Sequence, residues 1–409
     1  MKQSIVVMKF GGTSLRDAER VKNAAQRIVS SKSQGNRVVV VVSAPGDMTD
    51  ELLKRAQSIA EDPDGRELDI LLATGEQVSI ALMCMAIKNF GVEAISLTGP
   101  QAGIQTDDVH TKARIRTVKP KKLLSELNKG RIVVVAGFQG LNTRDDIVTL
   151  GRGGSDLTAV ALAAALKAEI CEIYTDVAGV FTTDPRLESE AQKIDQISYD
   201  EMLELAGSGS QIMQARSIEV AKKFGVKIHV RSSMELMKKG TIIANAVKDL
   251  EAPVVTGVSY EKNEAKISIS GVPDRPGVAA AIFGALAQDA INIDMIIQSA
   301  AENAENDISF TVARGDLKRA LLSLESIRIK LGAKKIESED RVAKISIVGV
   351  GMRGHSGVAA KMFTILARAG VNIEMISTSE IKISVVVEES DGLKTLRLLH
   401  KAFGLGKKR

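Results

Sequence analysis

Two glycine-rich segments of this chain place free backbone amides beside a cation. The first is KFGGTS, from Lys9 to Ser14, and the second is GRGGSD, from Gly151 to Asp156. Glycine lets the main chain approach a ligand closely, the amides of a turn bind anions, and a helix N-terminus favours negative charge. Lys9 and Arg152 add full positive charges. Together these features predict a site for phosphate and carboxylate groups.

The best-known phosphate-binding motifs are missing from the sequence. The chain contains no GxxxxGK followed by Ser or Thr, which disfavours a P-loop fold, and neither HRD nor DFG, which belong to the protein-kinase set. A single GG pair more often marks only a turn. Because two such pairs occur here, each beside a cation, we interpret them as ligand-binding turns.

Short apolar runs alternate with longer helical stretches over the first 247 residues. The runs are apolar and rich in β-branched residues, which is typical of strands that helices cover on both faces. The alternation predicts a parallel α/β sheet, with the glycine segments at strand or helix ends. The runs are Ile5–Met8, Val38–Val42, Ala94–Leu97, Ile132–Ala136, Ile170–Tyr174 and Lys227–Val230.

The sequence after residue 265 repeats itself. Gly277-Val278-Ala279-Ala280 recurs as Gly357-Val358-Ala359-Ala360, 80 residues later. Each copy reads as a strand, a glycine-containing loop, an amphipathic helix, two strands and a second helix. A unit of this size cannot easily bury both faces of its sheet, so we expect the copies to pair. A purely structural spacer is the alternative interpretation.

Length and composition bound the class of protein. A chain of 409 residues exceeds one ordinary core, so two or three domains are expected. The net charge is only +5, aromatic residues make up 3% and Trp is absent, so we expect no nucleic-acid partner. Cys84 and Cys171 have no CxxC companions, which favours a reduced cytoplasmic setting without structural zinc. The sequence shows no signal peptide and no apolar run of roughly 18 residues, so no membrane partner is expected either.

Five motifs in this order resemble aspartate kinase, and the two repeats resemble ACT domains, which are small amino-acid-binding regulatory modules. The motifs are KFGGTS at Lys9, SAPGDMTDELL at Ser43, ATGEQ at Ala73, GRGGSDLTA at Gly151 and YTDVAGVFTTDPR at Tyr174. The resemblance implies a monofunctional enzyme with the amino-acid kinase fold, a parallel-rich open α/β sheet sandwiched by helices, followed by two ferredoxin-like ACT domains. It places the catalytic domain at residues 1–247, a linker at 248–264, and the ACT domains at 265–340 and 341–409.

The implied reaction transfers the γ-phosphoryl group of ATP to the β-carboxylate of L-aspartate and gives 4-phospho-L-aspartate, the first step towards lysine, threonine and methionine. A β-carboxylate is already ionised at neutral pH, so the nucleophile needs no general base. It needs charge cancellation by cations, backbone amides and Mg²⁺. By resemblance, Lys9 contacts the transferring phosphoryl group, and Asp156 orients Lys9 or helps to hold the metal ion. A helix N-cap beside Ser155 is the competing interpretation of Asp156. No metal site built from protein residues alone is expected.

Aspartate also carries an α-carboxylate and an ammonium group that must be fixed. The resemblance assigns the α-carboxylate to Arg152, which can bind it in a bidentate manner, and the ammonium to Glu76. Without the resemblance, Glu76 would read as a first-turn helix residue. The further substrate positions are Ser43, Thr49 and Ser155. The implied ATP-binding residues are Lys9, Phe10, Gly11, Gly12, Thr13, Ser14, Gly153, Gly154, Thr175, Asp176, Phe181, Asp184 and Arg186.

One position departs from the family pattern. Gln211 stands where relatives usually carry a Lys that contacts nucleotide phosphate, and a neutral amide forfeits that charge. Arg216 is the candidate to compensate for it.

In the ACT repeats, the loop after the first strand and the strand that follows the first helix are expected to bind an effector against a partner copy. Lysine, threonine or both are the expected feedback inhibitors, and pairing of ACT domains implies at least a homodimer. The expected effector residues are Asp274, Gly277, Val278, Ala279, Asn292, Ile293, Asp294 and Gln298 in the first repeat, and Val358, Ala359, Asn372, Ile373, Ser379 and Glu380 in the second.

Three alternatives follow from the same residues. Another amino-acid kinase could act on glutamate, acetylglutamate, carbamate or a nucleotide, but the ACT repeats and the KFGGTS start weigh against it. A bifunctional enzyme with a homoserine dehydrogenase is disfavoured, because no GxGxxG opens a new βαβ unit. A catalytically weak or silent amino-acid sensor would fit Gln211, whereas Lys9, Glu76, Arg152 and Asp156 argue for an enzyme.

Overall fold

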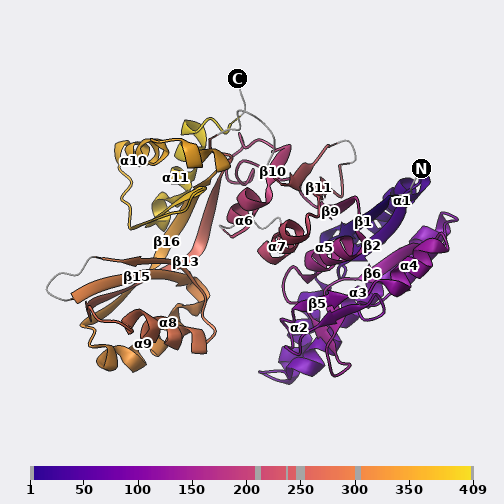
Figure 1. Ribbon diagram of the computed structural model, residues 1–409, viewed down its shortest axis with the longest axis horizontal. Helices are drawn as coiled ribbons and strands as arrows, with labels where there is room; N and C mark the ends of the chain where they lie inside the picture. Colours follow the sequence, from indigo (N-terminus) through magenta and orange to yellow (C-terminus); the bar gives the residue numbers. More distant parts are fainter. Residues whose placement is uncertain (1–3, 208–212, 236–237, 246–253, 300–304, 407–409) are drawn as a thin grey trace. The chain divides into compact units, whose positions relative to one another are not determined.

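The computed structural model describes residues 4–207, 213–235, 238–245, 254–299 and 305–406. The chain forms two compact units (Figure 1). Unit 1 comprises residues 1–180, 193–206 and 211–249, and unit 2 comprises residues 181–192, 207–210 and 250–409. Gln211 lies outside the described residues.

Unit 1 is built on an eight-stranded sheet in the order β10-β12-β11-β9-β1-β2-β6-β3. All pairings are parallel except that of β11 with β12, which confirms the predicted parallel-rich α/β fold. Each predicted apolar run lies in one of these strands or overlaps it. Their bounds are β1 Ile5–Phe10, β2 Arg37–Val42, β3 Ala94–Leu97, β6 Ile132–Ala136, β9 Ile170–Thr175, β10 Gln196–Ser198, β11 Ile228–Ser232 and β12 Thr241–Ala244.

Helices cover the sheet because the central strands are apolar on both faces. Helices α1 (Ala18–Ser33) and α3 (Gly65–Asn89) share one buried cluster with alternate residues of β1 and β2. Helix α5 (Gly154–Leu166) packs against β1, β2, β9 and α7, and it is buried on almost all sides. Helix α3 is long and apolar enough to cross a membrane by composition, and half of that stretch is buried inside unit 1. The other helices are α2 Met48–Ile59, α4 Lys121–Asn128, α6 Tyr199–Gly207 and α7 Ala215–Phe224.

A small second sheet, β5-β4-β7-β8, completes unit 1. Its strands are β4 Ile104–Thr106, β5 Ile115–Val118, β7 Gln139–Leu141 and β8 Ile147–Thr149. Buried Asp69 of α3 ties this sheet to the main layer. Its carboxylate accepts hydrogen bonds from the Thr149 amide (3.0 Å) and the Thr111 amide (3.1 Å), and His110 Nδ1 lies 2.8 Å away. This network supports the loop that follows β8.

Unit 2 contains both repeats in one six-stranded antiparallel sheet, β14-β15-β13-β16-β18-β17. Each repeat packs two helices on the sheet, α8 and α9 in the first and α10 and α11 in the second. The strands are β13 Gly257–Pro273, β14 Ile293–Gln298, β15 Glu305–Ala313, β16 Lys335–Val348, β17 Met375–Thr378 and β18 Lys382–Glu388, and the helices are α8 Val278–Gln288, α9 Leu317–Leu331, α10 Val358–Arg368 and α11 Glu389–Ala402.

The two central strands of this sheet belong to both repeats. The first half of β13, from Gly257 to Glu261, pairs with the end of β16, and its second half pairs with the beginning of β16. Residues 257–264, which the sequence placed in a linker, therefore form part of the sheet. The linker expectation failed here because strand Gly257–Glu261 finds its partner more than 80 residues later in the chain.

Equivalent side chains of the two repeats form reciprocal ion pairs across unit 2. Lys266 Nζ lies 2.6 Å from Glu374, and its counterpart Lys344 pairs with Asp294, the counterpart of Glu374. Lys344 is buried and also lies 3.1 Å from the buried carboxylate of Glu264. The two copies thus pair within one chain, as the repeat pattern predicts for such small modules.

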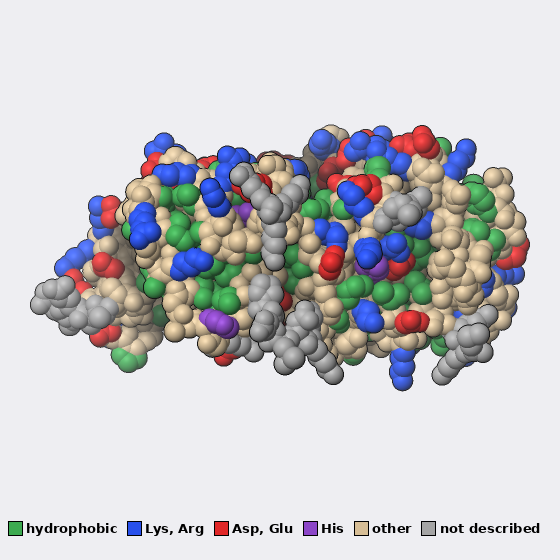
Figure 2. All heavy atoms as spheres, turned by 90° about the horizontal axis from the view of Figure 1, so that it is seen from above, with side chains coloured by type: hydrophobic (Ala, Val, Ile, Leu, Met, Phe, Trp, Pro, Cys, Tyr) green, Lys and Arg blue, Asp and Glu red, His purple; other side chains and the backbone are tan. Residues whose placement is uncertain are grey.

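Charges of both signs intermingle on the face shown in Figure 2, where hydrophobic side chains lie between them. This distribution agrees with the modest net charge of the sequence.

Candidate functional site

Predicted ATP-binding and substrate residues lie at the carboxyl ends of neighbouring parallel strands. Gly11 follows β1, Ser43 follows β2 and Thr175 ends β9, and Gly137, which was not predicted, follows β6 between them and the sheet edge. In an open parallel sheet, ligands bind at this edge, where the loops of adjacent strands diverge. The loops here approach closely, because a Cβ atom at Gly12 would lie 2.8 Å from the carbonyl oxygens of Ala44 and Gly46.

Lys9 and Asp156 form an ion pair at the centre of this edge. Lys9 Nζ lies 2.6 Å from Asp156 Oδ1, and each side chain is 12% exposed. Lys9 comes from β1, and Asp156 comes from the first turn of α5, where a carboxylate is favoured by the helix dipole. The helix begins after Gly153, whose φ of 71° explains the glycine. The structure therefore joins the two glycine-rich segments through their charged residues.

Glu76 is buried on α3 against the loop after β2. Its Oε1 accepts a hydrogen bond from the Ala44 amide at 3.0 Å, and Oε2 has no hydrogen-bond partner among the described residues. Gly75 makes this approach feasible, because a Cβ there would lie 2.7 Å from the Ala44 Cβ. Burial raises the pKa of Glu76 to about 7. A half-satisfied buried carboxyl is suited to receive a cationic group of a ligand.

The other predicted substrate residues lie on loops or in the first turns of helices. Arg152 is exposed and sits between Gly151 and Gly153, both with positive φ. Ser155 is buried, and a side chain at Gly137 would collide with its Oγ. Ser43 and Thr49 are partly exposed, after β2 and in the first turn of α2.

Backbone groups dominate the first glycine segment. Residues Gly12–Leu15 form a 3₁₀ turn, in which the Ser14 amide bonds to the Gly11 carbonyl at 3.0 Å. Phe10 is 1% exposed and its ring stacks on Tyr174 with centroids 4.7 Å apart, so only its main chain faces the loop region. The sequence could not distinguish this buried ring from a ligand contact.

The predicted ATP residues divide between the units. Gly153, Gly154, Thr175 and Asp176 belong to unit 1 together with the first glycine segment, whereas Phe181, Asp184 and Arg186 belong to unit 2. Asp184 and Arg186 form a bidentate ion pair, with Arg186 Nη2 2.7 Å from Asp184 Oδ2, and this arginine holds the pKa of Asp184 below its usual range.

Arg216, the candidate to compensate for Gln211, makes structural contacts. Its guanidinium donates to the carbonyl oxygens of Leu150 at 3.0 Å and Ala113 at 3.1 Å, just before the Gly151 loop. Asp69 and Gly137 also support this region, and sequence reasoning missed all three roles. A glycine directly after a buried strand was the available signal for Gly137; the other two roles depend on long-range contacts.

Several of the predicted effector residues occupy equivalent places in the two repeats. Gly277 and Gly357 precede α8 and α10 with φ of 96° and 97°, and Asn292 and Asn372 are exposed before β14 and β17. Asp274 accepts a hydrogen bond from Asn306 at 2.9 Å. Ile293, Gln298, Ser379 and Glu380 lie at or next to the edge strands, and Val278, Ala279, Val358 and Ala359 begin the helices.

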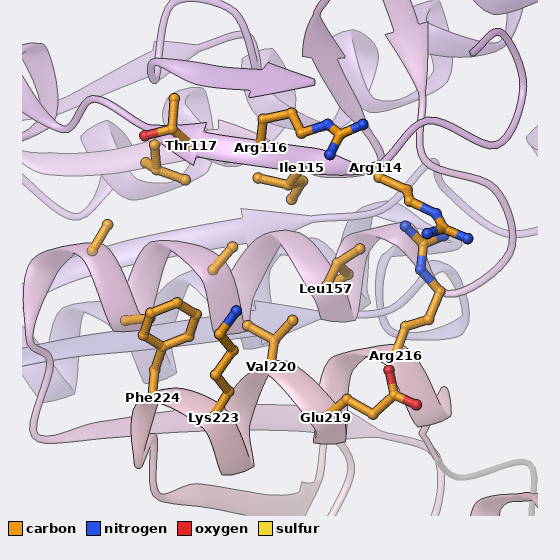
Figure 3. A pocket seen from close by; sticks show the side chains of 14 residues that line it. Arg114, Ile115, Arg116, Thr117, Leu157, Arg216, Glu219, Val220, Lys223 and Phe224 are labelled. Atoms are coloured by element: carbon orange, nitrogen blue, oxygen red, sulfur yellow. The ribbon is translucent and has the colours of Figure 1, made fainter. Parts of the chain in front are cut away.

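A separate cavity of about 690 Å³ lies between β5, α5 and α7 (Figure 3). Arg114, Arg116 and Lys223 line it together with apolar side chains that include Leu157 and Val220. Arg216, the candidate to compensate for Gln211, lines this cavity, whereas the predicted catalytic, substrate and ATP residues do not.

Comparison with known proteins bears on this geometry. Residues 4–232 match the amino acid kinase family, and residues 267–326 and 345–403 each match an ACT domain. The chain is 51% identical to an aspartokinase of Bacillus sp. (strain MGA3) over 98% of this chain and 97% of that protein, and 49% identical to an aspartokinase of Corynebacterium glutamicum over the same shares.

Solved aspartokinase structures share the fold of this chain. The E. coli aspartokinase III in complex with aspartate and ADP, described as an R-state, matches with a TM-score of 0.82 and 26% identity, covering 97% of this chain and 99% of that one. The same enzyme in complex with lysine and aspartate, described as a T-state, matches with a TM-score of 0.77 and 25% identity over 98% and 99%. The Lys9–Asp156 centre, the paired ACT modules and near-full-length identity together place this chain in the aspartokinase family.

Proposed function

We propose that the β1–β2–α5 edge of unit 1 binds L-aspartate and the phosphates of ATP, and that Lys9 is the central catalytic cation. The observation that carries this proposal is the Lys9–Asp156 ion pair of 2.6 Å between the two glycine-rich segments. The chain is an aspartokinase, so the acceptor is the β-carboxylate of aspartate and the product is 4-phospho-L-aspartate.

The reaction brings the aspartate carboxylate close to the ATP phosphates, and the cation and amide groups of the site reduce the repulsion between these two anions. Lys9 neutralises charge on the transferring phosphoryl group, and the amides of Gly12 and Thr13 donate hydrogen bonds to phosphate oxygens. Asp156 acts on Lys9 by fixing its ammonium group. No side chain needs to remove a proton, because the attacking carboxylate is ionised at neutral pH.

Aspartate is oriented by one anion and one cation of the protein. Glu76 receives the α-ammonium on its free Oε2, and Arg152 receives the α-carboxylate from its exposed position between Gly151 and Gly153. Ser43, Thr49 and Ser155 supply hydroxyl groups around the same position. Holding the substrate at three points directs the β-carboxylate towards the phosphoryl group.

The residues of this site fit Mg²⁺ that binds together with ATP. No group of three or more His, Cys, Asp or Glu side chains that could hold a metal ion occurs in the described part of the chain. Mg²⁺ needs only one or two protein carboxylates when it binds substrate phosphates, and Asp156 is the carboxylate at hand. When bound, Mg²⁺ would neutralise phosphate charge.

Feedback regulation is assigned to unit 2. The E. coli relative was crystallised with lysine, and the glycine turns before α8 and α10 offer free backbone groups for such an α-amino acid. We propose lysine, threonine or both as effectors, and a homo-oligomer formed through further ACT pairing. Both cysteines are free and buried, which fits a cytoplasmic enzyme.

The experiment is aspartate-dependent ADP release with Mg²⁺ and ATP, in which hydroxylamine traps the acyl phosphate as the hydroxamate. Lysine and threonine are added singly and together. Hydroxamate formation that either effector depresses supports the assignment, and loss of turnover in Lys9→Met locates the site. Saturable effector binding without turnover would instead indicate a silent sensor.

A further inference from the structure

Residues Phe181–Gln192 fold with the regulatory unit although they lie within the sequence of the kinase region. The segment leaves unit 1 after Val180 and returns at Lys193. Its ends are joined by hydrogen bonds of the Thr182 amide to the Gln192 carbonyl (2.8 Å) and of the Gln192 amide to Thr182 Oγ1 (3.0 Å). The segment is therefore a closed loop that carries three of the residues expected to bind ATP.

One buried hydroxyl connects this loop to the second ACT module. Thr182 Oγ1 lies 2.9 Å from Nε2 of His400 on α11 and donates to the Leu405 carbonyl at 3.2 Å. The Thr182 carbonyl accepts from the Val258 amide at 2.7 Å. Thr182 is 8% exposed and His400 is 1% exposed, so water does not compete for these bonds.

Further contacts hold the rest of the loop and its returning end. Arg397 of α11 donates from Nε (3.1 Å) and Nη2 (3.0 Å) to the carbonyl oxygen of Leu187. Ala191 pairs with Gly406 as an antiparallel bridge, and the Gln192 side-chain amide donates to the Gly406 carbonyl. Leu405 belongs to the hydrophobic cluster of the second ACT module, and partly buried Leu187 packs against that cluster.

His400 is suited to a fixed structural bond. Desolvation lowers its pKa, so the buried imidazole is neutral near pH 7. A neutral imidazole has one donor and one acceptor nitrogen, and a hydroxyl that donates to Leu405 can still accept from Nε2–H.

We propose that Thr182, His400 and Arg397 are positioning residues for nucleotide binding. Helix α11 and the residues after it hold the Phe181–Gln192 loop in the conformation that presents Phe181, Asp184 and Arg186. This inference rests on the proposed role of those three residues in ATP binding. Its consequence is that the second ACT module sets the KM for ATP through direct contact with the loop.

The test compares two adjacent buried threonines. Thr182→Val removes the shared hydroxyl, whereas Thr183→Val is the matched control, because the Thr183 hydroxyl has no hydrogen-bond partner in the described part of the chain. Thr182→Ser restores the hydroxyl. We expect Thr182→Val to raise the KM for ATP about tenfold, because buried partners lose their bonds, while kcat and the KM for aspartate stay within about twofold. Thr183→Val and Thr182→Ser should keep a KM for ATP near that of the wild type.

Arg397→Met provides a second variant that does not disturb the core, since Arg397 is exposed; Arg368→Met on α10 is its control. We expect a rise of about threefold in the KM for ATP with Arg397→Met only. Equal KM values for ATP in Thr182→Val and Thr183→Val would overturn the inference. A fall in kcat together with a rise in the KM for both ATP and aspartate would also overturn it. Asp184→Asn separates the positioning role of Thr182 from the nucleotide-binding role of the loop. If it raises the KM for ATP and Thr182→Val does not, the positioning role fails alone, and if neither changes it, the nucleotide role of the loop fails too.

Discussion

The Glu76→Gln exchange tests whether burial sets the charge of the carboxyl that we propose to bind the ammonium group of aspartate. Burial raises the pKa of Glu76 from 4.5 to about 7. The folded state therefore holds this proton more tightly than the unfolded chain does. As pH rises from 4.5 to about 7, Glu76 ionises in the unfolded chain while it stays largely protonated in the folded state. This difference lowers the free energy of unfolding by about 3 kcal/mol at most, and the full loss of stability persists above this window. The E76Q protein lacks this penalty and should be more stable than the wild type at pH 8 but not at pH 4.5.

Aspartate binding should release the proton that Glu76 carries in the folded state. The α-ammonium of aspartate requires an ionised carboxylate, so binding at pH 6 should release nearly one proton from Glu76 for each aspartate bound. With a pKa of about 7, only about a tenth of the sites are ionised at pH 6, so aspartate should bind about tenfold more weakly there than at pH 8. In E76Q the pH dependence and the proton release should vanish, and affinity at pH 8 should fall at least tenfold, on the order of one lost charge-assisted hydrogen bond.

Calorimetric titration with aspartate at pH 6 and pH 8, in two buffers of different ionisation enthalpy, measures both effects. Glu67→Gln is the control, because Glu67 lies on the same helix with a side chain that is 66% exposed. Wild-type protein that binds aspartate equally at both pH values without proton release would refute the assignment of Glu76 as a buried, protonated carboxyl.

Three further substitutions probe separate contacts. Asp156→Asn removes the partner of Lys9 and should lower kcat at least tenfold in the ADP-release assay, with the KM for aspartate less affected; unchanged kcat would contradict the positioning of Lys9. Arg152→Met should raise the KM for aspartate about tenfold through loss of a charged hydrogen bond, whereas exposed Arg144→Met should not. Lys344→Met leaves Glu264 and Asp294 without their buried cation and should destabilise unit 2 by about 3 kcal/mol in denaturant unfolding. Lys335→Met, at an exposed pair on the same strand, is its control and should change stability little.

The local patterns of the chain predicted the catalytic half well. Apolar runs gave the strands because a strand covered on both faces must be apolar throughout, and the glycine turns appear at their ends. The family resemblance implied that Asp156 orients Lys9 or helps to hold the metal ion, and in the structure these two side chains form an ion pair.

The sequence by itself determined the family, the sheet, the repeat and the residue types of the site, because these follow from motifs and periodicities within a few residues. Tertiary structure alone decided three other features: the burial of Glu76, the shared strands β13 and β16, and the attachment of the Phe181–Gln192 loop to His400. Each depends on residues far apart in the chain, such as Thr182 and His400, whose contact leaves no local pattern. Burial and long-range pairing are properties of the packed chain, and they set the pKa of Glu76 and the support of the loop.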